Sequence, residues 1–451
     1  MYPNGYKEYQ ANLAPLTLFP TPFPRIEFEK AKSIATAYNK LYANIVSQHQ
    51  WLLDAVRSLS EFDTTFTGKL YQCYLEAEKR GIVQPVALGL VRSDYMYDTV
   101  SKVIKQVEYN TVSVSFAGIS REVGKLHKFL NDSGLYTKSG EKYYGEDGLI
   151  VSDAADGLAR GLREAVSYYE RTHSSPGKTI VLFVVQPNER NAFDQRHIEY
   201  SLFEKFGIVS KRIELPDVTA SVKVDNQTRK LFYQDREVSV VYYRSAYGPG
   251  EFTKKETWDC RILLESTLAI KCPSLLVQLS GAKKIQQLLT STAILDKFLP
   301  TDEKKADLVS TFCKIYPLDD SEDATIAKKL AFEKPENFVL KPQREGGGNN
   351  IYKEEIPGFL KSIPEKDWAG FILMELIHPP VAKNVMLRDG ELLRSGTVSE
   401  LGVYGSFLFN EKTGKIIHNE YQGHLLRSKI SSSNEGGVAA GYGCVDSLYL
   451  I

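Results

Sequence analysis

Hydrophobic and polar positions along the chain follow two different periods. Helical spacing of apolar residues predicts helices over 27–53 and 66–80. Short apolar or alternating runs predict strands at 86–91, 104–116 and 179–185. The later part of the chain continues this mixture, with strands predicted at 238–243, 338–341 and 371–377 and helices predicted at 260–289 and 323–332. Such switching between the two periods is typical of a mixed α/β protein.

The chain also carries signs of domain organisation. The segment 171–178 (RTHSSPGK) is polar, contains Pro and Gly, and precedes an apolar run, so we place a boundary there. A second unit begins near residue 179, and a third unit lies at about 315–400. No period of 20 to 50 residues repeats, which excludes solenoid and propeller folds.

Composition and charge exclude several classes of function. The 56 Lys and Arg residues balance the 56 Asp and Glu residues, so no overall basic field would attract nucleic acid or anionic lipid. The longest purely apolar run, 180–185, is far shorter than the roughly 20 residues of a membrane helix. The first residues, MYPNGYKEYQ, show no secretory signal, and we expect a cytoplasmic protein. The five cysteines are scattered without a CxxC pair, and we expect reduced thiols.

The most unusual segment is KPQREGGGNN at 341–350, directly after a predicted strand. Its three successive glycines permit positive φ angles, with which backbone amides turn inward and enclose an anion. Lys341 adds positive charge, and Glu345 suits Mg²⁺, which takes one or two carboxylates and completes its shell with phosphate oxygens and water. We therefore predict a site for a nucleotide with a metal ion. The alternative is a flexible, exposed glycine turn.

A second polar group interrupts the predicted strand 104–116 (its second part reads QVEYNTVSVSF). Strand alternation places Glu108 and Asn110 on one face. A carboxylate and an amide oxygen in this arrangement would share one Mg²⁺ with Glu345. Two serines, at 113 and 115, continue the polar character towards a substrate. The alternative is a solvated edge strand.

Polar residues also follow three other predicted strands. Arg92 would grip a carboxylate or a transferred phosphoryl group with both of its terminal nitrogens. The predicted strand 179–185 is followed by the segment 189–195 (ERNAFDQ), and the predicted strand 238–243 is followed by Arg244 and Tyr247. Loops at strand ends are where α/β proteins bind ligands. Their guanidinium, phenol, amide and carboxylate groups suit the zwitterionic head of an amino acid. Each of these residues taken alone is more commonly a surface residue.

Near the C-terminus a small-residue segment, 435–441 (EGGVAAG), follows a basic strand on which Arg427 and Lys429 share a face. Such a loop is able to close over a small substrate and exclude water. The alternative is a Gly/Ala hinge or a packed turn, and the neighbouring cations favour a functional loop.

Together these segments resemble the eukaryotic glutathione synthetases of the ATP-grasp superfamily, and the fungal members in particular. The resemblance covers about 16–450, and its most specific stretches are RSDYM (92–96), QVEYNTVSVSF, ERNAFDQ, QLSGAKKIQQLL (278–289), KPQREGGGNN and EGGVAAG. It implies an α/β fold with an ATP-grasp body, an inserted α/β substrate-binding domain and a lid domain. The expected borders are 1–178 and 285–451 for the two parts of the body, 179–284 for the inserted domain and about 315–400 for the lid.

The resemblance also implies an activity, the ATP-dependent ligation of γ-glutamylcysteine to glycine, with glutathione, ADP and phosphate as products. In the family, the cysteinyl carboxylate attacks the γ-phosphate, and glycine then displaces phosphate from the resulting acyl phosphate. The expected ligands are ATP, γ-glutamylcysteine and glycine, the expected cofactor is Mg²⁺, and the expected assembly is a homodimer without nucleic acid or membrane partners.

The resemblance assigns roles residue by residue. Mg²⁺ would be held by Glu108, Asn110 and Glu345. Arg92 and Arg427 would be the catalytic residues, and Arg92 would stabilise the transferred phosphoryl charge. ATP would be contacted by Lys283, Lys341, Gly346, Gly347, Gly348, Asn350, Tyr352, Met374, Glu375, Leu376, Ile377, Glu400, Lys429 and Glu435. γ-Glutamylcysteine would be bound by Arg92, Ser113, Ser115, Glu189, Asn191, Gln195, Arg244 and Tyr247, and the glycine end by Arg427, Val438 and Ala439.

The small-residue segment bears on the choice of acceptor. Relatives that make homoglutathione carry a bulkier, proline-containing sequence there, whereas the run VAA at 438–440 is compact and favours glycine over β-alanine. The chain departs from the family at Glu435, where many relatives have Asp, and in a shorter N-terminus. Two alternatives stay open: an ATP-grasp ligase with a different acceptor, and a non-catalytic binding protein that keeps the fold.

Overall fold

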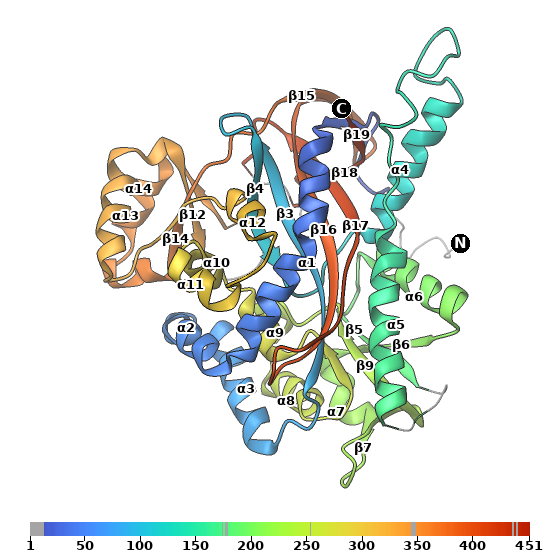
Figure 1. Cartoon of the computed structure of the whole chain (residues 1–451), viewed down its shortest axis with the longest axis vertical. Coiled ribbons are helices and arrows are strands. Elements are labelled where there is room, and N and C mark those ends of the chain that lie inside the picture. The colour runs from blue at the N-terminus through green and yellow to red at the C-terminus, as the bar shows by residue number, and fades with distance from the viewer. Residues whose placement is uncertain are drawn as a thin grey trace.

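A mixed β-sheet runs through the centre of the molecule (Figure 1). The computed structural model describes residues 13–173, 175, 179–252, 254–343, 349–434, 437–438 and 441–451. Within these ranges thirteen strands share the sheet. Its main row consists of β15 (Ala382–Arg388), β1 (Leu16–Thr17), β18 (Gly443–Asp446), β17 (Ile416–Ile430), β16 (Glu391–Asn410), β3 (Val86–Asp98), β10 (Ile270–Cys272), β9 (Arg236–Tyr243), β5 (Ile180–Val185) and β6 (Val209–Glu214). Off this row are β4 (Val103–Asn110), which pairs with β3, and the strands β7 (Val222–Val224) and β8 (Leu231–Tyr233) beside β9.

The sheet combines antiparallel and parallel pairing, and β3 takes part in both. β3 pairs antiparallel with β4 and β16, and β16 with β17. From β3 through β10, β9 and β5 to β6, every neighbouring pair in the row is parallel. β5 has parallel neighbours on both sides and is buried along its whole length, which explains its unbroken apolar sequence. The predicted mixed α/β class is confirmed.

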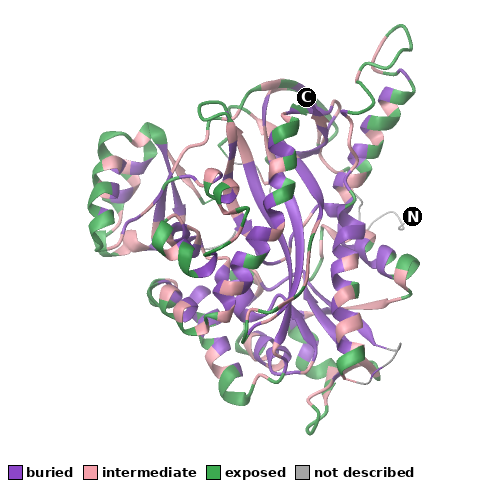
Figure 2. Ribbon diagram, in the orientation of Figure 1, coloured by how far each residue is buried: buried purple, intermediate pink, exposed green. Residues whose placement is uncertain are grey.

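Helices cover both faces of this sheet (Figure 1). One face carries α1 (Arg25–Ser47), α2 (His49–Phe62), α3 (Thr67–Arg80) and α8 (Lys255–Glu265), and the other carries α4 (Ala117–Asp132), α5 (Ala154–Thr172) and α6 (Ala192–Phe206). β16 shows how the two cores arise, because Leu401 and Val403 join the first core and Tyr404 and Leu408 the second. The sheet is therefore the buried centre, and the helices expose their outer sides (Figure 2). Within the described ranges, every helix is too short or too polar to cross a bilayer.

A separate four-stranded sheet lies beside the large one (Figure 1). Its strands, in spatial order, are β11 (Ile315–Pro317), β14 (Phe371–Glu375), β12 (Phe338–Pro342) and β13 (Ile351–Tyr352). The helices α13 (Glu322–Glu333) and α14 (Glu355–Ser362) pack on it around a small core of their own. The last strand of the four-stranded sheet along the chain, β14, ends at Glu375, and the following strands β15 and β16 belong to the large sheet. The C-terminal strand β19 (Leu448–Leu450) pairs with β2 (Thr21–Phe23) in a third, two-stranded sheet.

Two predicted strands have different lengths in the structure. The strand predicted at 86–91 continues to Asp98, and the strand predicted at 104–116 ends at Asn110. The first difference arises because Arg92, Ser93 and Asp94 are buried between β16 and β4, where they keep their ladder hydrogen bonds. The second arises because the chain turns after Asn110, with positive φ at Ser113 and Phe116.

Two predicted helices are interrupted. The pattern over 27–53 covers α1 and part of α2, with the break at Gln48. The continuous helix predicted over 260–289 is wrong, because strand β10 lies within it, flanked by short helices. A short apolar run does not distinguish a buried strand from a helical turn. The helices that follow α8 are α9 (Leu275–Ser280), α10 (Lys283–Leu289), α11 (Thr292–Phe298) and α12 (Lys305–Ser310).

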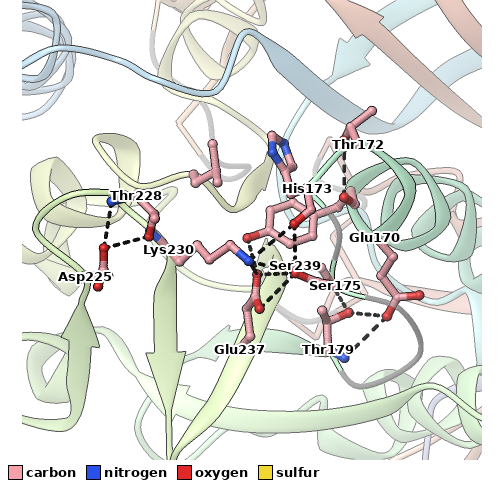
Figure 3. A network of polar contacts seen from close by, with 12 residues as sticks. Glu170, Thr172, His173, Ser175, Thr179, Asp225, Thr228, Lys230, Glu237 and Ser239 are labelled. Atoms are coloured by element: carbon pink, nitrogen blue, oxygen red, sulfur yellow. Dashed lines mark hydrogen bonds and ion pairs between the residues drawn. The ribbon is translucent and has the colours of Figure 1, made fainter.

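A polar network surrounds the connection from α5 to β5, where we placed a domain boundary (Figure 3). Glu237 accepts hydrogen bonds from the Ser175 hydroxyl over 2.8 Å and forms an ion pair with Lys230 over 3.0 Å. On the other side of the connection, the Thr179 hydroxyl donates to Glu170 over 2.8 Å. Both described ends of the connection are thus tied to neighbouring elements of the body.

Candidate active site

A cavity of about 660 Å³ lies between the large sheet and the four-stranded sheet. The large sheet contributes Arg92 from β3, Glu108 from β4 and Arg427 from β17. The four-stranded sheet contributes Lys341 from β12 and Met374 from β14. Strands that are remote in sequence therefore bring charged side chains of both signs to one space.

Most of the residues predicted for the site line this cavity. They are Arg92, Glu108, Asn110, Ser113, Ser115, Tyr247, Lys283, Lys341, Asn350, Tyr352, Met374, Glu375, Leu376, Ile377, Glu400, Arg427 and Lys429. Among the described residues, five predicted positions lie outside its lining, namely Glu189, Asn191, Gln195, Arg244 and Val438. The remaining predicted positions, Glu345, Gly346, Gly347, Gly348, Glu435 and Ala439, lie outside the described residues.

Two arginines of the cavity wall share one fully buried carboxylate, Asp94. Arg92 Nε and Nη2 donate to its two oxygens over 2.6 and 2.8 Å. Arg427 Nη2 donates to Asp94 Oδ2 over 2.9 Å and also contacts Glu400. Burial opposes the charge of the arginines, but the neighbouring carboxylates outweigh it and raise the pKa of Arg92 and of Arg427. Burial likewise opposes ionisation of Asp94, yet the two arginines outweigh it and lower its pKa.

Glu108 and Asn110 both line the cavity, as strand alternation predicts. Asn110 Nδ2 donates to Asp94 Oδ2 over 2.9 Å and to the Arg92 carbonyl over 3.3 Å, so its Oδ1 is the amide atom left to face a cation. Glu108 Oε2 lies 3.9 Å from Lys283 Nζ. In the part of the chain that the structure describes, no three His, Cys, Asp or Glu side chains gather as a metal site, and the predicted third ligand, Glu345, falls outside it.

Four lysines line the cavity, and three of them, at 283, 341 and 429, come from α10, β12 and β17. Lys341 is buried, and its Nζ donates to the Val107 carbonyl over 3.3 Å. Burial lowers the pKa of Lys341, because the charged form is poorly solvated there. Lys429 Nζ donates to the Asn434 carbonyl over 2.6 Å. A bound polyanion would compensate these partly desolvated charges.

The segment 374–377, which we expect to meet adenine with its backbone, forms part of the same wall. The N–H of Glu375 donates to the Lys314 carbonyl over 3.0 Å, and that of Leu376 donates to the Asn337 carbonyl over 2.9 Å. Because these two donors are already engaged, other backbone groups of the segment, such as the N–H of Ile377, would have to contact the base.

Arg244 lies behind the cavity wall and is almost completely buried. Its Nη1 donates to the Val114 carbonyl over 2.9 Å and its Nη2 to the Ser115 hydroxyl over 2.8 Å. Arg244 therefore fixes the segment after β4 that presents Ser115. Tyr247 does line the cavity, and its hydroxyl accepts a hydrogen bond from Gln186 over 2.9 Å.

Glu189 and Gln195 form a pair next to this region. Gln195 Nε2 donates to Glu189 over 2.6 Å, and the Asn191 N–H donates to the same carboxylate over 2.8 Å. Arg212 donates to Gln195 Oε1 over 2.6 Å and thereby sets the direction of the amide. In the C-terminal small-residue segment, Val438 is buried in the core beside α5.

The sequence analysis missed Asp94 as part of this constellation. The signal was present, since Asp94 stands two positions after Arg92 and would share its strand face if the strand were extended beyond 91. The lining residues Glu336, His378 and Asn434 were also missed, and no pattern in their neighbourhood indicates a ligand site.

Comparison with known proteins adds independent information. The family model described as "Eukaryotic glutathione synthase, ATP binding domain" matches residues 1–450. The "Glutathione synthetase large chain" of Schizosaccharomyces pombe is 41% identical over 462 residues, which cover 98% of this chain and 91% of that protein. The "Glutathione synthetase" of Rattus norvegicus is 38% identical over 443 residues, which cover 97% of this chain and 90% of that protein.

A solved structure is similar as well. The apo structure of a glutathione synthetase-like effector from Globodera pallida superimposes with a TM-score of 0.76, covering 98% of this chain and 91% of that chain. Its sequence identity is 24%, so this likeness bears on the fold alone.

Proposed function

The chain belongs to the eukaryotic glutathione synthase family, and we propose that it is an ATP-dependent ligase that joins γ-glutamylcysteine to glycine and forms glutathione, ADP and phosphate. The observation that carries the proposal is the convergence, in one cavity, of two arginines, four lysines and a carboxylate–amide pair, most of them carried by strands of two sheets. This set of groups suits a nucleoside triphosphate beside a carboxylate substrate.

The first chemical step forms an acyl phosphate. An oxygen of the cysteinyl carboxylate attacks the γ-phosphorus of ATP, the new O–P bond forms, and ADP leaves. Arg92 faces the cavity and is held as a cation by Asp94, so it is placed to neutralise the charge that spreads over the transferred phosphoryl oxygens. Lys283 and Lys341 would bind the phosphates of the nucleotide.

The second step transfers the acyl group to glycine. The glycine nitrogen attacks the acyl carbon, and the tetrahedral intermediate then expels phosphate, which carries away the former carboxylate oxygen. The amine loses its proton as the amide bond forms. Arg427, whose guanidinium lines the cavity beside Glu400, would hold the glycine carboxylate and thus bring the amine to the acyl carbon.

We further propose Mg²⁺ as the cofactor, held by Glu108, Asn110 and Glu345. The described residues fit this ion, because the Glu108 carboxylate and the Asn110 amide oxygen, two positions apart on one strand, are ligand types that Mg²⁺ accepts. When bound, Mg²⁺ would neutralise part of the negative charge of the ATP phosphates.

The remaining predicted contacts divide between the two substrates. Ser115 and Tyr247 would touch γ-glutamylcysteine directly, since they line the cavity. Arg244 and the pair of Glu189 with Gln195 would complete the recognition of its γ-glutamyl end. The compact sequence at 438–440 supports glycine as the acceptor, because relatives that make homoglutathione carry a bulkier, proline-containing sequence there. The family resemblance further supports a cytoplasmic homodimer, and light scattering of the purified protein tests its oligomeric state.

The acyl phosphate is tested with isotope-labelled substrate. We expect γ-glutamylcysteine labelled with ¹⁸O in its cysteinyl carboxylate to transfer one label to inorganic phosphate in each turnover, because that oxygen forms the bond to the phosphoryl group. Mass spectrometry of the phosphate measures the transfer, with labelled water and unlabelled dipeptide as the control. Phosphate that takes its oxygen from water instead would contradict the acyl phosphate.

A further inference from the structure

Asp94 is the one fully buried carboxylate, among the described residues, that contacts both arginines of the cavity wall. It lies in β3, where that strand is flanked by its antiparallel neighbours β16 and β4. Asp94 accepts four hydrogen bonds of 2.6 to 2.9 Å, two from Arg92, one from Arg427 and one from Asn110. None of the chemical steps described above requires Asp94 to touch a substrate.

We propose that Asp94 is a positioning residue of the ligase, which holds the guanidinium groups of Arg92 and Arg427 and sets the Asn110 amide so that its oxygen faces the cation site. This inference rests on the proposed function for the roles of those three residues. It concerns how they are held, which the assignment of ligands does not explain.

The chemistry of the groups fixes the direction of the Asn110 amide. A carboxylate only accepts hydrogen bonds, so Asn110 must turn its NH₂ group towards Asp94. The Arg92 carbonyl accepts from the same NH₂ group over 3.3 Å and enforces the same orientation. The amide oxygen then points away from Asp94, towards the face of β4 that Glu108 also occupies.

The same carboxylate holds the two arginines in one geometry. Arg92 binds both oxygens of Asp94 with Nε and Nη2, and its Nη1 donates to the Ser115 carbonyl over 3.3 Å. Arg427 belongs to β17, on the far side of β16 from β3, and donates to Asp94 over 2.9 Å. Without the carboxylate, two buried guanidinium groups would repel each other in a poorly solvated site.

The strand next to β3 leaves room for this arrangement. Gly402 of β16 is paired directly with Asp94. A Cβ atom at Gly402 would lie 2.7 Å from Arg92 Cδ and 3.0 Å from Asp94 Oδ1. A side chain at position 402 would therefore displace the ion pair, so the absence of one there matches the proposed role.

The main test is Asp94→Asn, which keeps the size of the side chain and removes its charge. An asparagine accepts with one atom only and carries no charge, so the Asn110 amide loses one of the two contacts that set its direction and both arginines lose their counter-charge. We expect kcat to fall about 10- to 100-fold and the Mg²⁺ concentration for half-maximal activity to rise by a similar factor, as for other residues that orient metal ligands. Calorimetric titration of ATP at several Mg²⁺ concentrations, without any turnover, should show that the variant needs more Mg²⁺ than the unaltered protein to bind ATP equally well.

Asp446→Asn is the matched control. Asp446 is also a fully buried carboxylate of the large sheet, but it accepts from the hydroxyl groups of Thr17, Thr21 and Ser428 rather than from the arginines. We expect this variant to lower the melting temperature while its Mg²⁺ dependence stays that of the unaltered protein. If Asp94→Asn changes only the melting temperature, as the control does, Asp94 is merely structural and the proposal is overturned.

A second pair of variants covers the case in which Asp94→Asn does not fold. Gly402→Ala should displace the Arg92–Asp94 pair and raise the Mg²⁺ concentration for half-maximal activity. Gly405→Ala, three residues further along β16, would place its methyl group against Asn39 instead. Equal Mg²⁺ dependence in these two variants would contradict the proposal. Failure of the proposed function looks different, because the unaltered protein would then bind ATP with Mg²⁺ but show no glycine-dependent turnover, while the calorimetric difference caused by Asp94→Asn would persist.

Discussion

Several charged side chains of the cavity are shielded from water. The arginines at 92 and 427 stay charged because carboxylates are built in beside them, and Lys341 is desolvated beside a carbonyl. Such groups gain more from an incoming anion than exposed side chains do, because the surrounding medium screens the interaction less. The sequence revealed the identities of these residues but not Asp94, since nothing in a single chain of letters reports which charges are buried together.

At Arg92 we predict that lysine is a poor replacement. A lysine keeps the charge but has no planar fork with which to bind both oxygens of Asp94, so the charge would no longer be held towards the phosphoryl group. Arg92→Lys should lower kcat roughly 100-fold, about the loss seen when one transition-state contact is removed. Steady-state kinetics measures this, with Arg121→Lys as the control, because Arg121 pairs with Asp156 between α4 and α5, outside the lining of the cavity. A kcat within twofold of the unaltered enzyme would contradict the assigned role of Arg92.

Away from the cavity, Glu411 predicts a pH dependence of stability. Burial raises the pKa of Glu411 from an ordinary value of 4.5 to about 7, and the hydrogen bond from Ser274 opposes the shift only in part. A raised pKa means that the folded state holds the proton more tightly than the unfolded state. The contribution of Glu411 to the free energy of unfolding is therefore complete below pH 4.5 and is lost as the pH rises through 7, by about 3 kcal/mol at most.

Glu411→Gln removes this titration. We expect the difference in the free energy of unfolding between the unaltered protein and the variant to fall steadily from pH 5 to pH 8, as measured by urea unfolding at each pH. A difference that stays constant over this range would show that Glu411 titrates normally in the folded protein.

Single elements are held at the site by contacts between distant segments. Helix α4 begins after Phe116, a residue in the left-handed region whose side chain offers no cap. Asp194, from the start of α6, supplies the missing acceptor for the N–H groups of Phe116 and Gly118 over 2.7 Å each and of Ile119 over 3.2 Å. The cap also fixes the segment that presents Ser115 to the cavity.

Asp194→Ala should therefore act on both stability and binding. Three buried N–H groups would lose their acceptor, and we expect the free energy of unfolding to fall by about 2–3 kcal/mol. The KM for γ-glutamylcysteine should rise, because the segment after β4 loses its anchor. Denaturant unfolding and kinetics check the two effects, and Asp153→Ala at the start of α5 is the control, since Asp153 makes no cap hydrogen bond there. An unchanged KM would show that the Asp194 cap does not position the segment that presents Ser115.

The elements that the sequence predicted best are those whose environment is uniform. β5 is buried throughout and α3 is amphipathic along its length, so local patterns were sufficient. β3 and the segment 260–289 were misread because their polar or apolar residues acquire their meaning only from neighbours on β16, β4 and β9. Local periodicity does not contain those long-range pairings.

At the scale of the whole molecule, the cavity lies where the two sheets meet. Strands β3 and β4 bind the two segments of chain that lead into and out of the four-stranded sheet. The N–H of Gln106 on β4 donates to the Thr311 carbonyl over 2.7 Å, just before the four-stranded sheet begins. The N–H of His378 donates to Asp98 at the end of β3 over 3.0 Å, just after the same sheet ends. The large sheet and the four-stranded sheet are therefore joined at β3, β4 and the turn between them.

The residues that meet in this space were predicted mainly through their resemblance to a known family. Residue chemistry alone joined the phosphate segment and the metal pair through a shared Mg²⁺, and it did not indicate that the groups for amino acid recognition lie in the same cavity. Their union depends on the pairing of strands more than 300 residues apart, such as β3 with β16, which the order of the chain does not disclose.

The most direct measurement is ADP release by the purified protein with ATP, Mg²⁺ and γ-glutamylcysteine, in parallel reactions with glycine, with β-alanine and without an acceptor. We predict turnover that depends on glycine, with a peptide product of the mass of glutathione in the mass spectrum. Preference for β-alanine would contradict the assigned acceptor while the ATP-dependent ligation stands. ATP binding without turnover in any of the reactions would contradict the proposal that this protein is a glutathione-forming ligase.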